Sequence, residues 1–453
     1  MRRALLLGTL LVAACDRAPP ASGAPTSAAT PAAVEATVEG LSFEQGRRLA
    51  HERRQPLLVE FHAPWCYSCY YMAQHVMTGP QWAQVRERAV VVEVDVDAPQ
   101  GAALKQRYGI RALPSYLLLD SDGDELGRIL GEQTREDFYA AIDALLARGT
   151  DLDALARLAD GTDAKAVDAA RQVLASWHAR DAADAALAWF AAREDAVRAA
   201  LAADETVAQW LARLRFMAAA QSGDMQACLD AGEAALEGEL GCARAYELGR
   251  YLACGGEVPP PRARLLAQRE PMQALVEQGA FGTSRCADER SLILTMAKLE
   301  AALGDREAQI ALLRRAMADV ERRLAGVLEA DRNLADNLRV YVEQLAMLTG
   351  DYTALDALMP ALIEAWPQDY VYALRHGRSL LARGQPEAAL EYLERAALHA
   401  YGLNRLQVAE QRVRALLALD RRDEARRVVG EALKANGPWF AEQAAALKAL
   451  LKT

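Results

Sequence analysis

The chain has 453 residues, a length that favours two or more domains over one. Hydrophobic residues make up 52% and charged residues 25%, which suffices for packed cores and excludes general disorder. The net charge of −10 argues against nucleic acid as a partner, because binding phosphates needs a basic surface.

The N-terminus reads as a targeting segment. A basic start precedes an apolar run that is shorter than the about 20 residues needed to span a bilayer. The run ends in Leu-Val-Ala-Ala-Cys15, which resembles a bacterial lipobox. This resemblance implies a signal peptide at 1–14, a lipid on Cys15 and, from Asp16 by analogy with enteric bacteria, the inner membrane. An ordinary secretory signal peptide is the alternative.

Residues 15–38 follow as a predicted flexible tether, because prolines among small residues cannot bury enough apolar surface to order the segment. Export would place the chain in an oxidising compartment, where disulfides persist.

Residues 39–149 have the pattern of one α/β domain that ends at Gly149-Thr150. Short apolar runs predict strands at 57–61, 90–96, 115–119 and 125–130, with an Asp122-Gly123 hairpin turn between the last two. Helices are predicted at 43–54, 70–76, 104–108 and 135–147, with a break at Gly79-Pro80. Strands alternating with helices, followed by a hairpin, predict an α/β sandwich around a mixed sheet.

Residues 150–453 are rich in alanine and leucine, which favour helices. A turn of the form Gly-x-x-x-Ala recurs at Gly223, Gly304, Gly350 and Gly384, with a variant beginning at Asp420. The last three turns are about 35 residues apart, close to the tetratricopeptide period. The best match is Tyr370–Ala397. It has His376-Gly377, Ala389, Leu393 and Ala396 at the places where that family has a small pair, an alanine, a large apolar residue and an alanine. We therefore expect an all-α, tetratricopeptide-like repeat domain; an irregular helical bundle is the alternative.

The chemistry-bearing motif is Cys66-Tyr67-Ser68-Cys69, between a predicted strand and a predicted helix. Unpaired N–H groups and the dipole at a helix N-terminus stabilise a thiolate at the first cysteine. A thiolate is the species that attacks a disulfide. Cys69 lies one helical turn later and can resolve the mixed disulfide.

The stretch from Leu58 to Cys69 resembles the active-site strand and loop of the thioredoxin superfamily, and Leu58–Trp65 is similar to protein disulfide isomerases. The whole segment from Phe43 to Leu146 resembles the C-terminal thioredoxin-like domain of the membrane reductases that supply the periplasm with electrons. Tyr108–Ser115 is similar to the family's segment ending in a cis-proline. The resemblance implies that Pro114 faces the sulfurs and that the backbone of Leu113 pairs with an extended substrate.

Two acids stand near the motif by the same resemblance. Glu60 occupies the position of a buried acid in the superfamily; burial would raise its pKa and let it accept the Cys69 proton. Glu93 stands where many thioredoxins have a lysine. It would either raise the Glu60 pKa further or point to solvent at the sheet edge.

The residues around the cysteines carry weaker signals. Trp65 is expected to shield the site, while Tyr67 and Ser68 are expected to support a substrate groove. The pair Tyr67-Ser68 lacks the histidine that strong oxidants have between their cysteines. Its absence favours a reductase. Tyr70 and Tyr71 fit a substrate surface or ordinary packing equally well.

The remaining cysteines, Cys228, Cys242, Cys254 and Cys286, are expected to form structural disulfides between neighbouring hairpins, with three pairings possible. No cofactor is expected. Zinc is not expected either, because there is no second C-x-x-C, so His62 and His75 are interpreted as packing or surface residues.

The sequence thus predicts a lipid-anchored, periplasmic thiol–disulfide oxidoreductase whose repeats select exported protein clients or a redox partner. Two alternatives remain. One is a thioredoxin–repeat co-chaperone that binds proteins with little redox activity, and the other is a scaffold for a membrane assembly.

Overall fold

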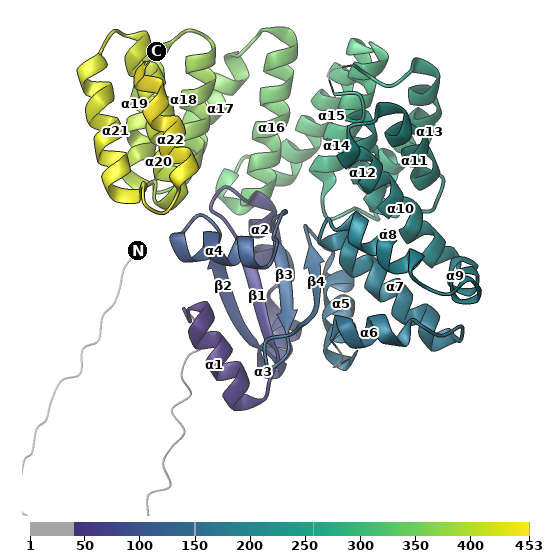
Figure 1. Cartoon of the computed structure of the whole chain (residues 1–453). Coiled ribbons are helices and arrows are strands. Elements are labelled where there is room, and N and C mark those ends of the chain that lie inside the picture. The colour runs from purple at the N-terminus through teal and green to yellow at the C-terminus, as the bar shows by residue number, and fades with distance from the viewer. Residues whose placement is uncertain (1–39, 149–150, 257, 453) are drawn as a thin grey trace, which may run out of the picture. The chain divides into compact units, whose positions relative to one another are not determined.

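The computed structural model describes residues 40–148, 151–256 and 258–452 (Figure 1). The predicted signal peptide, Cys15 and the tether lie outside the described residues, as does Gly149-Thr150. Glu39–Thr453 forms one compact unit, so the sheet and the helical repeats can be described together.

A four-stranded mixed sheet lies at the centre of the first domain, in the order β2-β1-β3-β4. The strands are β1 (Leu57–His62), β2 (Val90–Asp95), β3 (Ser115–Leu119) and β4 (Glu125–Leu130). β1 is parallel to β2 and antiparallel to β3, which pairs with β4 as the predicted hairpin. The strand predictions are confirmed to within one residue, because each buried run is short and clearly bounded.

Seven helical segments accompany this sheet. They are α1 (Phe43–Arg53), α2 (Tyr67–Tyr71), the π-helix η1 (Met72–Val76), α3 (Gly79–Arg88), α4 (Pro99–Arg107), α5 (Arg135–Arg148) and, beyond the domain, α6 (Leu152–Leu158) against β4.

Three helix predictions in this domain need correction. Gly79-Pro80 is the start of α3 and not merely a break, because proline lacks an N–H and fits the first helical turn. For the same reason Pro99 begins α4, five residues before the predicted start at 104. The predicted helix at 70–76 is α2 continued as a π-helix, a departure that the apolar pattern alone does not encode.

The sheet has a core on each face. Leu58, Tyr116 and Leu118 face η1, α3 and α5, where they pack with Met72 and Phe138. The alternate residues of β1 face the other way, towards α1 and α4. Since side chains alternate along a strand, Glu60 projects on the same face as Leu58, the face covered by η1 and α3.

The rest of the chain is helical. The helices are α7 (Ala164–Ala179), α8 (Ala183–Ala191), α9 (Asp195–Ala202), α10 (Glu205–Ser222), α11 (Met225–Leu236), α12 (Arg244–Leu252), α13 (Arg262–Gly279), α14 (Glu289–Leu303), α15 (Arg306–Leu324), α16 (Arg332–Thr349), α17 (Thr353–Ala365), α18 (Tyr370–Ala382), α19 (Pro386–His399), α20 (Gly402–Ala418), α21 (Arg422–Asn436) and α22 (Ala441–Ala449), with short 3-10 turns η2 (Gly241–Ala243), η3 (Leu328–Ala330) and η4 (Leu450–Lys452).

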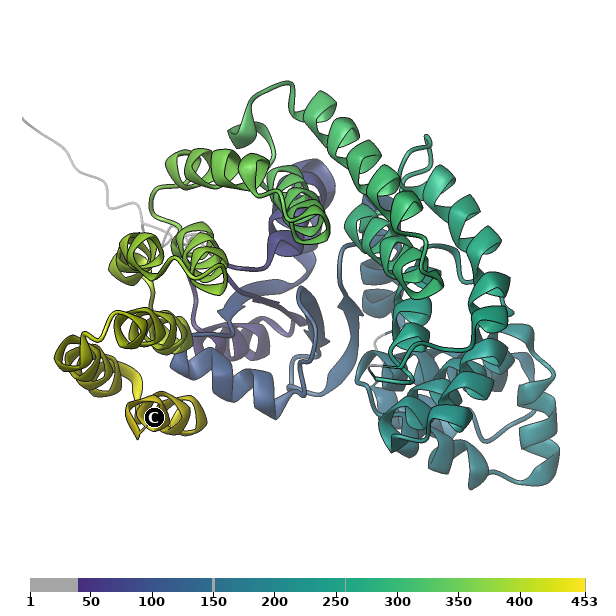
Figure 2. The same cartoon turned by 90° about the horizontal axis from the view of Figure 1, so that it is seen from above.

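From α10 onward each long helix packs mainly on its neighbours in sequence, and Figure 2 shows the pairs following one another side by side. One continuous core runs through them from Phe216 to Leu447. Gly377 shows why small residues recur in this region, because a Cβ there would lie 2.6 Å from Cγ of Leu393 on the paired helix. The predicted helical-repeat domain is confirmed.

The recurring glycine turn stops one helix and starts the next. Gly304 and Gly350 both have φ of +77° and end α14 and α16, a conformation that favours glycine. The aspartate after Gly304 then caps the next helix, since the Asp305 carboxylate accepts from the N–H of Ala308 at 3.0 Å. Stop and start signals side by side explain why this motif marks the hairpin turns.

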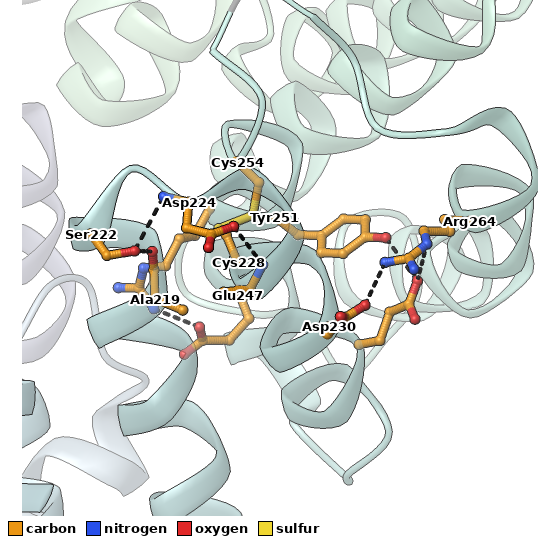
Figure 3. The surroundings of a disulfide bond; sticks show 12 residues. Ala219, Ser222, Asp224, Cys228, Asp230, Glu247, Tyr251, Cys254 and Arg264 are labelled. Atoms are coloured by element: carbon orange, nitrogen blue, oxygen red, sulfur yellow. Dashed lines mark hydrogen bonds and ion pairs between the residues drawn. A yellow bond between two sulfur atoms is a disulfide. The ribbon is translucent and has the colours of Figure 1, made fainter.

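Two disulfides join helices within the repeats, one between Cys228 and Cys254 and one between Cys242 and Cys286. The first links α11 to the end of α12. Figure 3 shows it near the Asp230–Arg264 ion pair, 3.0 Å long, which ties α11 to α13. The expectation that these four cysteines form disulfides is confirmed, and the structure supplies which of the three possible pairings is formed.

Removing the first of these disulfides is expected to destabilise this region. The bond closes a loop with a sequence separation of 26 residues. Constraining such a loop in the unfolded chain contributes about 3–4 kcal/mol. The double variant Cys228→Ala/Cys254→Ala should therefore unfold at a lower urea concentration and lose hydrogen-exchange protection in α11 and α12. Unchanged protection there would contradict a stabilising role.

No helix among the described residues is both long enough and apolar enough to cross a bilayer.

Candidate active site

Cys66 and Cys69 form a disulfide at the junction between β1 and α2, with their Cα atoms 5.3 Å apart. Cys66 is the N-cap of α2, and the backbone N–H of Cys69 donates to Cys66 Sγ at 3.2 Å. That N–H group is aimed at the sulfur on which a thiolate would develop, so it would stabilise the charge. The side chains are only 4% and 6% exposed, respectively.

Glu60 lies in the middle of β1 and is 7% exposed. Its neighbours in the sheet are Glu93 on β2 and Tyr116 on β3. Burial and, to a smaller extent, the charge of Glu93 together raise the pKa of Glu60 to about 8. Glu60 is therefore a neutral acid at pH 7 that can lose its proton just above neutrality.

Glu60 and Cys69 line the same cavity, which has a volume of about 330 Å³. Glu93 also reaches this cavity, although it lies on an edge strand and is exposed. The remaining lining residues are His62, Ala63, Pro64, Tyr70, Ala73, Met77 and Trp82. The cavity gives a proton or a water molecule a route between the Glu60 carboxyl and the sulfur of Cys69.

The peptide bond between Leu113 and Pro114 is cis, as the resemblance implied. Ser115 begins β3 and stands opposite Phe61 of β1, so Pro114 lies beside the end of β1 that leads into the cysteine motif. Pro114 is buried and Leu113 is half-buried. The Pro114 carbonyl accepts from the N–H of Gly131, which anchors this loop to the end of β4.

Trp65, directly before the first cysteine, is held by a buried acid. Its Nε1–H donates to Oδ2 of Asp97 at 2.6 Å, and the same oxygen accepts from Nδ2 of Asn404 in α20 at 3.0 Å. Burial raises the pKa of Asp97, while both hydrogen bonds oppose that rise. The orientation of Trp65 thus depends on the repeat domain.

Tyr67 and Ser68, expected to support an open groove, are covered by the repeats. The Tyr67 ring is 2% exposed and lies 5.4 Å from that of Tyr372, with the Arg375 guanidinium 4.9 Å above it. Arg290 of α14 donates to Ser68 Oγ at 3.3 Å. The side of the motif that carries Tyr67 and Ser68 is therefore a domain contact.

Tyr70 and Tyr71 divide between the two predicted roles. The Tyr70 hydroxyl donates to the Pro64 carbonyl at 3.1 Å, and the Arg332 guanidinium lies 4.0 Å above its ring. Tyr70 lines the cavity beside Cys69, whereas Tyr71 packs on His75 at 5.2 Å between ring centres.

His75 connects the first domain to α16. Its Nε2 lies 2.7 Å from Oδ2 of Asp331, the N-cap of α16. The hydrogen bond to Asp331 raises the pKa of His75. Burial opposes ionisation of Asp331, but the bond from His75 and two backbone N–H groups hold its pKa below the ordinary value. Among the described residues no group of three or more histidine, cysteine, aspartate or glutamate side chains is placed to hold a metal ion.

This pair is expected to loosen above neutral pH. Because the folded-state pKa of His75 is raised, its stabilisation is complete below about pH 6.5 and is lost as the pH rises through the folded value. Hydrogen exchange at the start of α16 should be slower at pH 6 than at pH 8.5, after correction for intrinsic rates. His75→Gln should remove that difference, and an unchanged difference would contradict this role.

Several residues at the site escaped the sequence analysis. Asn333 of α16 donates through Nδ2 both to the Tyr67 carbonyl at 3.1 Å and to Oε1 of Glu132 at 3.0 Å. Glu132 is buried directly after β4. The signal that the sequence offered for these residues is a row of polar side chains at helical spacing. It lies on the buried face of α16 and consists of Asn333, Asp336, Asn337 and Arg339. Buried polar residues in such a row require partners.

Comparison with known proteins agrees with this geometry. A family model described as a thioredoxin-like domain matches residues 43–146. The chain is 30% identical over 100 residues to the thiol:disulfide interchange protein DsbD of Cronobacter sakazakii, covering 21% of this chain and 17% of that protein. It is 28% identical over 111 residues to the chloroplastic thioredoxin-like protein HCF164 of Arabidopsis thaliana, covering 24% of this chain and 40% of the relative. The chain thus spans less than half the length of either relative.

Two solved structures are similar to parts of the chain. A thioredoxin from Thermus thermophilus is 28% identical with a TM-score of 0.23, covering 24% of this chain and 85% of that one. The tetratricopeptide domain of P58(IPK) is 15% identical with a TM-score of 0.21, covering 70% of this chain and 87% of that one. Residues 43–146 form a thioredoxin-like domain, which this chain carries fused to a domain of helical repeats.

Proposed function

We propose that this protein is a thiol–disulfide oxidoreductase that exchanges disulfides with client proteins through Cys66 and Cys69. The observation that carries the proposal is a disulfide at the first turn of α2 that shares a cavity with a buried, titratable glutamate. The similarity to a thiol:disulfide interchange protein supports it.

In the reductive direction, the Cys66 thiolate attacks one sulfur of a client disulfide. A new S–S bond joins Cys66 to the client, and the other client sulfur leaves as a thiolate. Once Glu60 has lost its own proton to solvent, its carboxylate accepts the Cys69 proton; the Cys69 thiolate then attacks Cys66 Sγ, which releases the second client sulfur as a thiolate. The two electrons of the dithiol end on the client, and the protein is left with its own disulfide. A protein dithiol must then restore the reduced state.

We infer that a membrane-anchored location outside the cytoplasm suits this chemistry, with a lipid on Cys15, and that the inner membrane is favoured. The interchange-protein relative and the two disulfides of the repeats support an oxidising compartment. The anchor is tested by cell fractionation. The wild-type chain should sediment with membranes, and Cys15→Ser should remove that association; membrane retention of Cys15→Ser would exclude the lipid.

The direction of electron flow is tested by the reduction potential of the Cys66–Cys69 pair, equilibrated with glutathione or dithiothreitol buffers. A reductase should have a value near about −270 mV, as in thioredoxin, whereas about −120 mV is the value of a strong oxidant. Absence of a reversible transition would overturn the redox proposal.

A second candidate function is protein binding with little redox turnover. It is favoured by one observation, namely that the repeats cover Tyr67 and Ser68 and leave both cysteines buried. A binding module would suppress aggregation of an unfolded protein equally well as wild type and as Cys66→Ala. An oxidoreductase would lose its reduction of insulin in that variant.

A further inference from the structure

A second buried carboxyl, that of Glu132, lies at the redox motif and is not among the residues that line the cavity shared by Glu60 and Cys69. Glu132 follows Gly131 at the end of β4 and is 8% exposed. The N–H of Gly131 donates to the Pro114 carbonyl at 2.8 Å, so Glu132 is fixed next to the cis-proline loop. The reaction proposed above makes no use of it.

Glu132 is connected directly to the residue pair between the cysteines. Ser68 of that pair favours the ionised form of the carboxyl group and so lowers the Glu132 pKa. Nδ2 of Asn333 donates to Glu132 Oε1 at 3.0 Å and to the Tyr67 carbonyl at 3.1 Å. Asn333 therefore bridges this carboxyl to the first turn of α2.

The charges around Glu132 come from several elements. Burial, followed by the charge of Asp288, raises the pKa of Glu132 to about 8 against the opposing effects of Arg290, Ser68 and Asn333. Arg290 is itself paired with Asp336 at 2.8 Å and donates to Ser68. The other titratable groups that face Glu132 are Tyr71 of α2, Tyr116 of β3 and Tyr246 of α12.

We propose that Glu132 is a positioning residue for the exchange reaction, which holds Ser68 and the first turn of α2 and, when ionised, disfavours the thiolate of Cys66. The inference rests on the proposed function and adds a residue to it. A negative charge joined to the first turn of α2 through Asn333 opposes a second negative charge at the N-cap sulfur. Neutral Glu132 permits the thiolate, so ionisation of Glu132 makes the reduced protein less favourable at alkaline pH.

The test compares how pH changes the equilibrium between the full chain and dithiothreitol buffers. Glu132→Gln keeps the shape of the side chain but cannot ionise. Wild type and Glu132→Gln should agree within about twofold at pH 6.5, where Glu132 is protonated. At pH 9 the variant should favour the reduced form about threefold or more relative to wild type, which corresponds to half a unit in the Cys66 pKa. A merely structural role would change the equilibrium by the same factor at pH 6.5 and at pH 9.

Two further variants secure the interpretation. Glu300→Gln changes another buried glutamate, paired with Arg269 at 2.9 Å, and should leave the pH dependence as in wild type. Asn333→Ala removes a donor that lowers the Glu132 pKa, so Glu132 should ionise, and the reduced form should become less favourable, only at a higher pH than in wild type. This variant provides the test if Glu132→Gln does not fold.

The outcomes separate cleanly. If wild type equilibrates reversibly, and the ratio of reduced to oxidised protein in Glu132→Gln equals that of wild type at both pH 6.5 and pH 9, the role of Glu132 is overturned and the proposed function stands. If wild type shows no reversible equilibrium at all, both fail.

Discussion

Replacing Cys69 by alanine is expected to turn the protein into a covalent trap for its clients. The backbone N–H of residue 69 would still donate a hydrogen bond to Cys66 Sγ, and Cys66 would still attack a client disulfide. No second thiol would then release the product. Incubating reduced Cys69→Ala with insulin should therefore give a stable adduct on non-reducing electrophoresis. Cys66→Ala should give no adduct, and its rate of insulin reduction should fall at least about 100-fold, to the uncatalysed background.

The matched control removes two sulfurs elsewhere. Cys228→Ala/Cys254→Ala lacks a disulfide of the repeats, and it should keep insulin reduction below its unfolding temperature. Equal turnover by Cys66→Ala and wild type, or an adduct formed by Cys66→Ala, would assign the reactive thiol elsewhere and contradict the mechanism.

A trapped client must reach sulfurs that are nearly buried, and the structure restricts the direction of approach. Tyr67 and Ser68 are in contact with α14 and α18. The hollowed surfaces lie on the side of Pro64 and Tyr70, where one cavity opens towards Glu60 and a second of about 540 Å³ reaches Trp366 and Tyr401. The repeats therefore shape the environment of the redox pair directly and do not merely extend the chain.

Local features of this protein could be predicted from the sequence because their causes are local. The buried strands follow from short apolar runs, and the glycine turns follow from left-handed backbone at Gly304 and Gly350. The position of Glu60 on the covered face follows from strand alternation, six residues before Cys66. Its raised pKa follows from that burial.

Contacts between distant segments could not be predicted in this way. The Tyr67 ring is covered by Tyr372, and nothing in the motif itself signals a partner so far along the chain. Glu132 is inconspicuous in sequence because its significance arises only where Asn333 reaches it from α16. The disulfide pairing likewise depends on which helices become neighbours.

Glu60→Gln is expected to make the protein more stable and less active at once. The folded-state pKa of Glu60, about 8, lies above the ordinary value of 4.5, so the folded state holds this proton more tightly than the unfolded chain does. The stability that protonated Glu60 contributes is complete below about pH 4.5 and is lost as the pH rises through about 8. Glutamine avoids this loss, and the gain in unfolding free energy should be roughly 3 kcal/mol at pH 7 and near zero at pH 4. Urea unfolding at the two pH values measures it.

The same substitution removes the group that accepts the Cys69 proton, so release of the mixed disulfide should slow by about 100-fold. Glu93→Gln is the matched control, because it removes only the neighbouring charge that raises the Glu60 pKa. It should preserve the maximal rate and move the pH profile of the release step to lower pH. If Glu60→Gln were more stable but equally fast, the buried acid would be a cost to folding without a part in proton transfer. If Glu60→Gln were instead slower but no more stable than wild type, Glu60 would already be ionised in the folded protein. The Cys69 proton would then be accepted by a base that is charged at neutral pH.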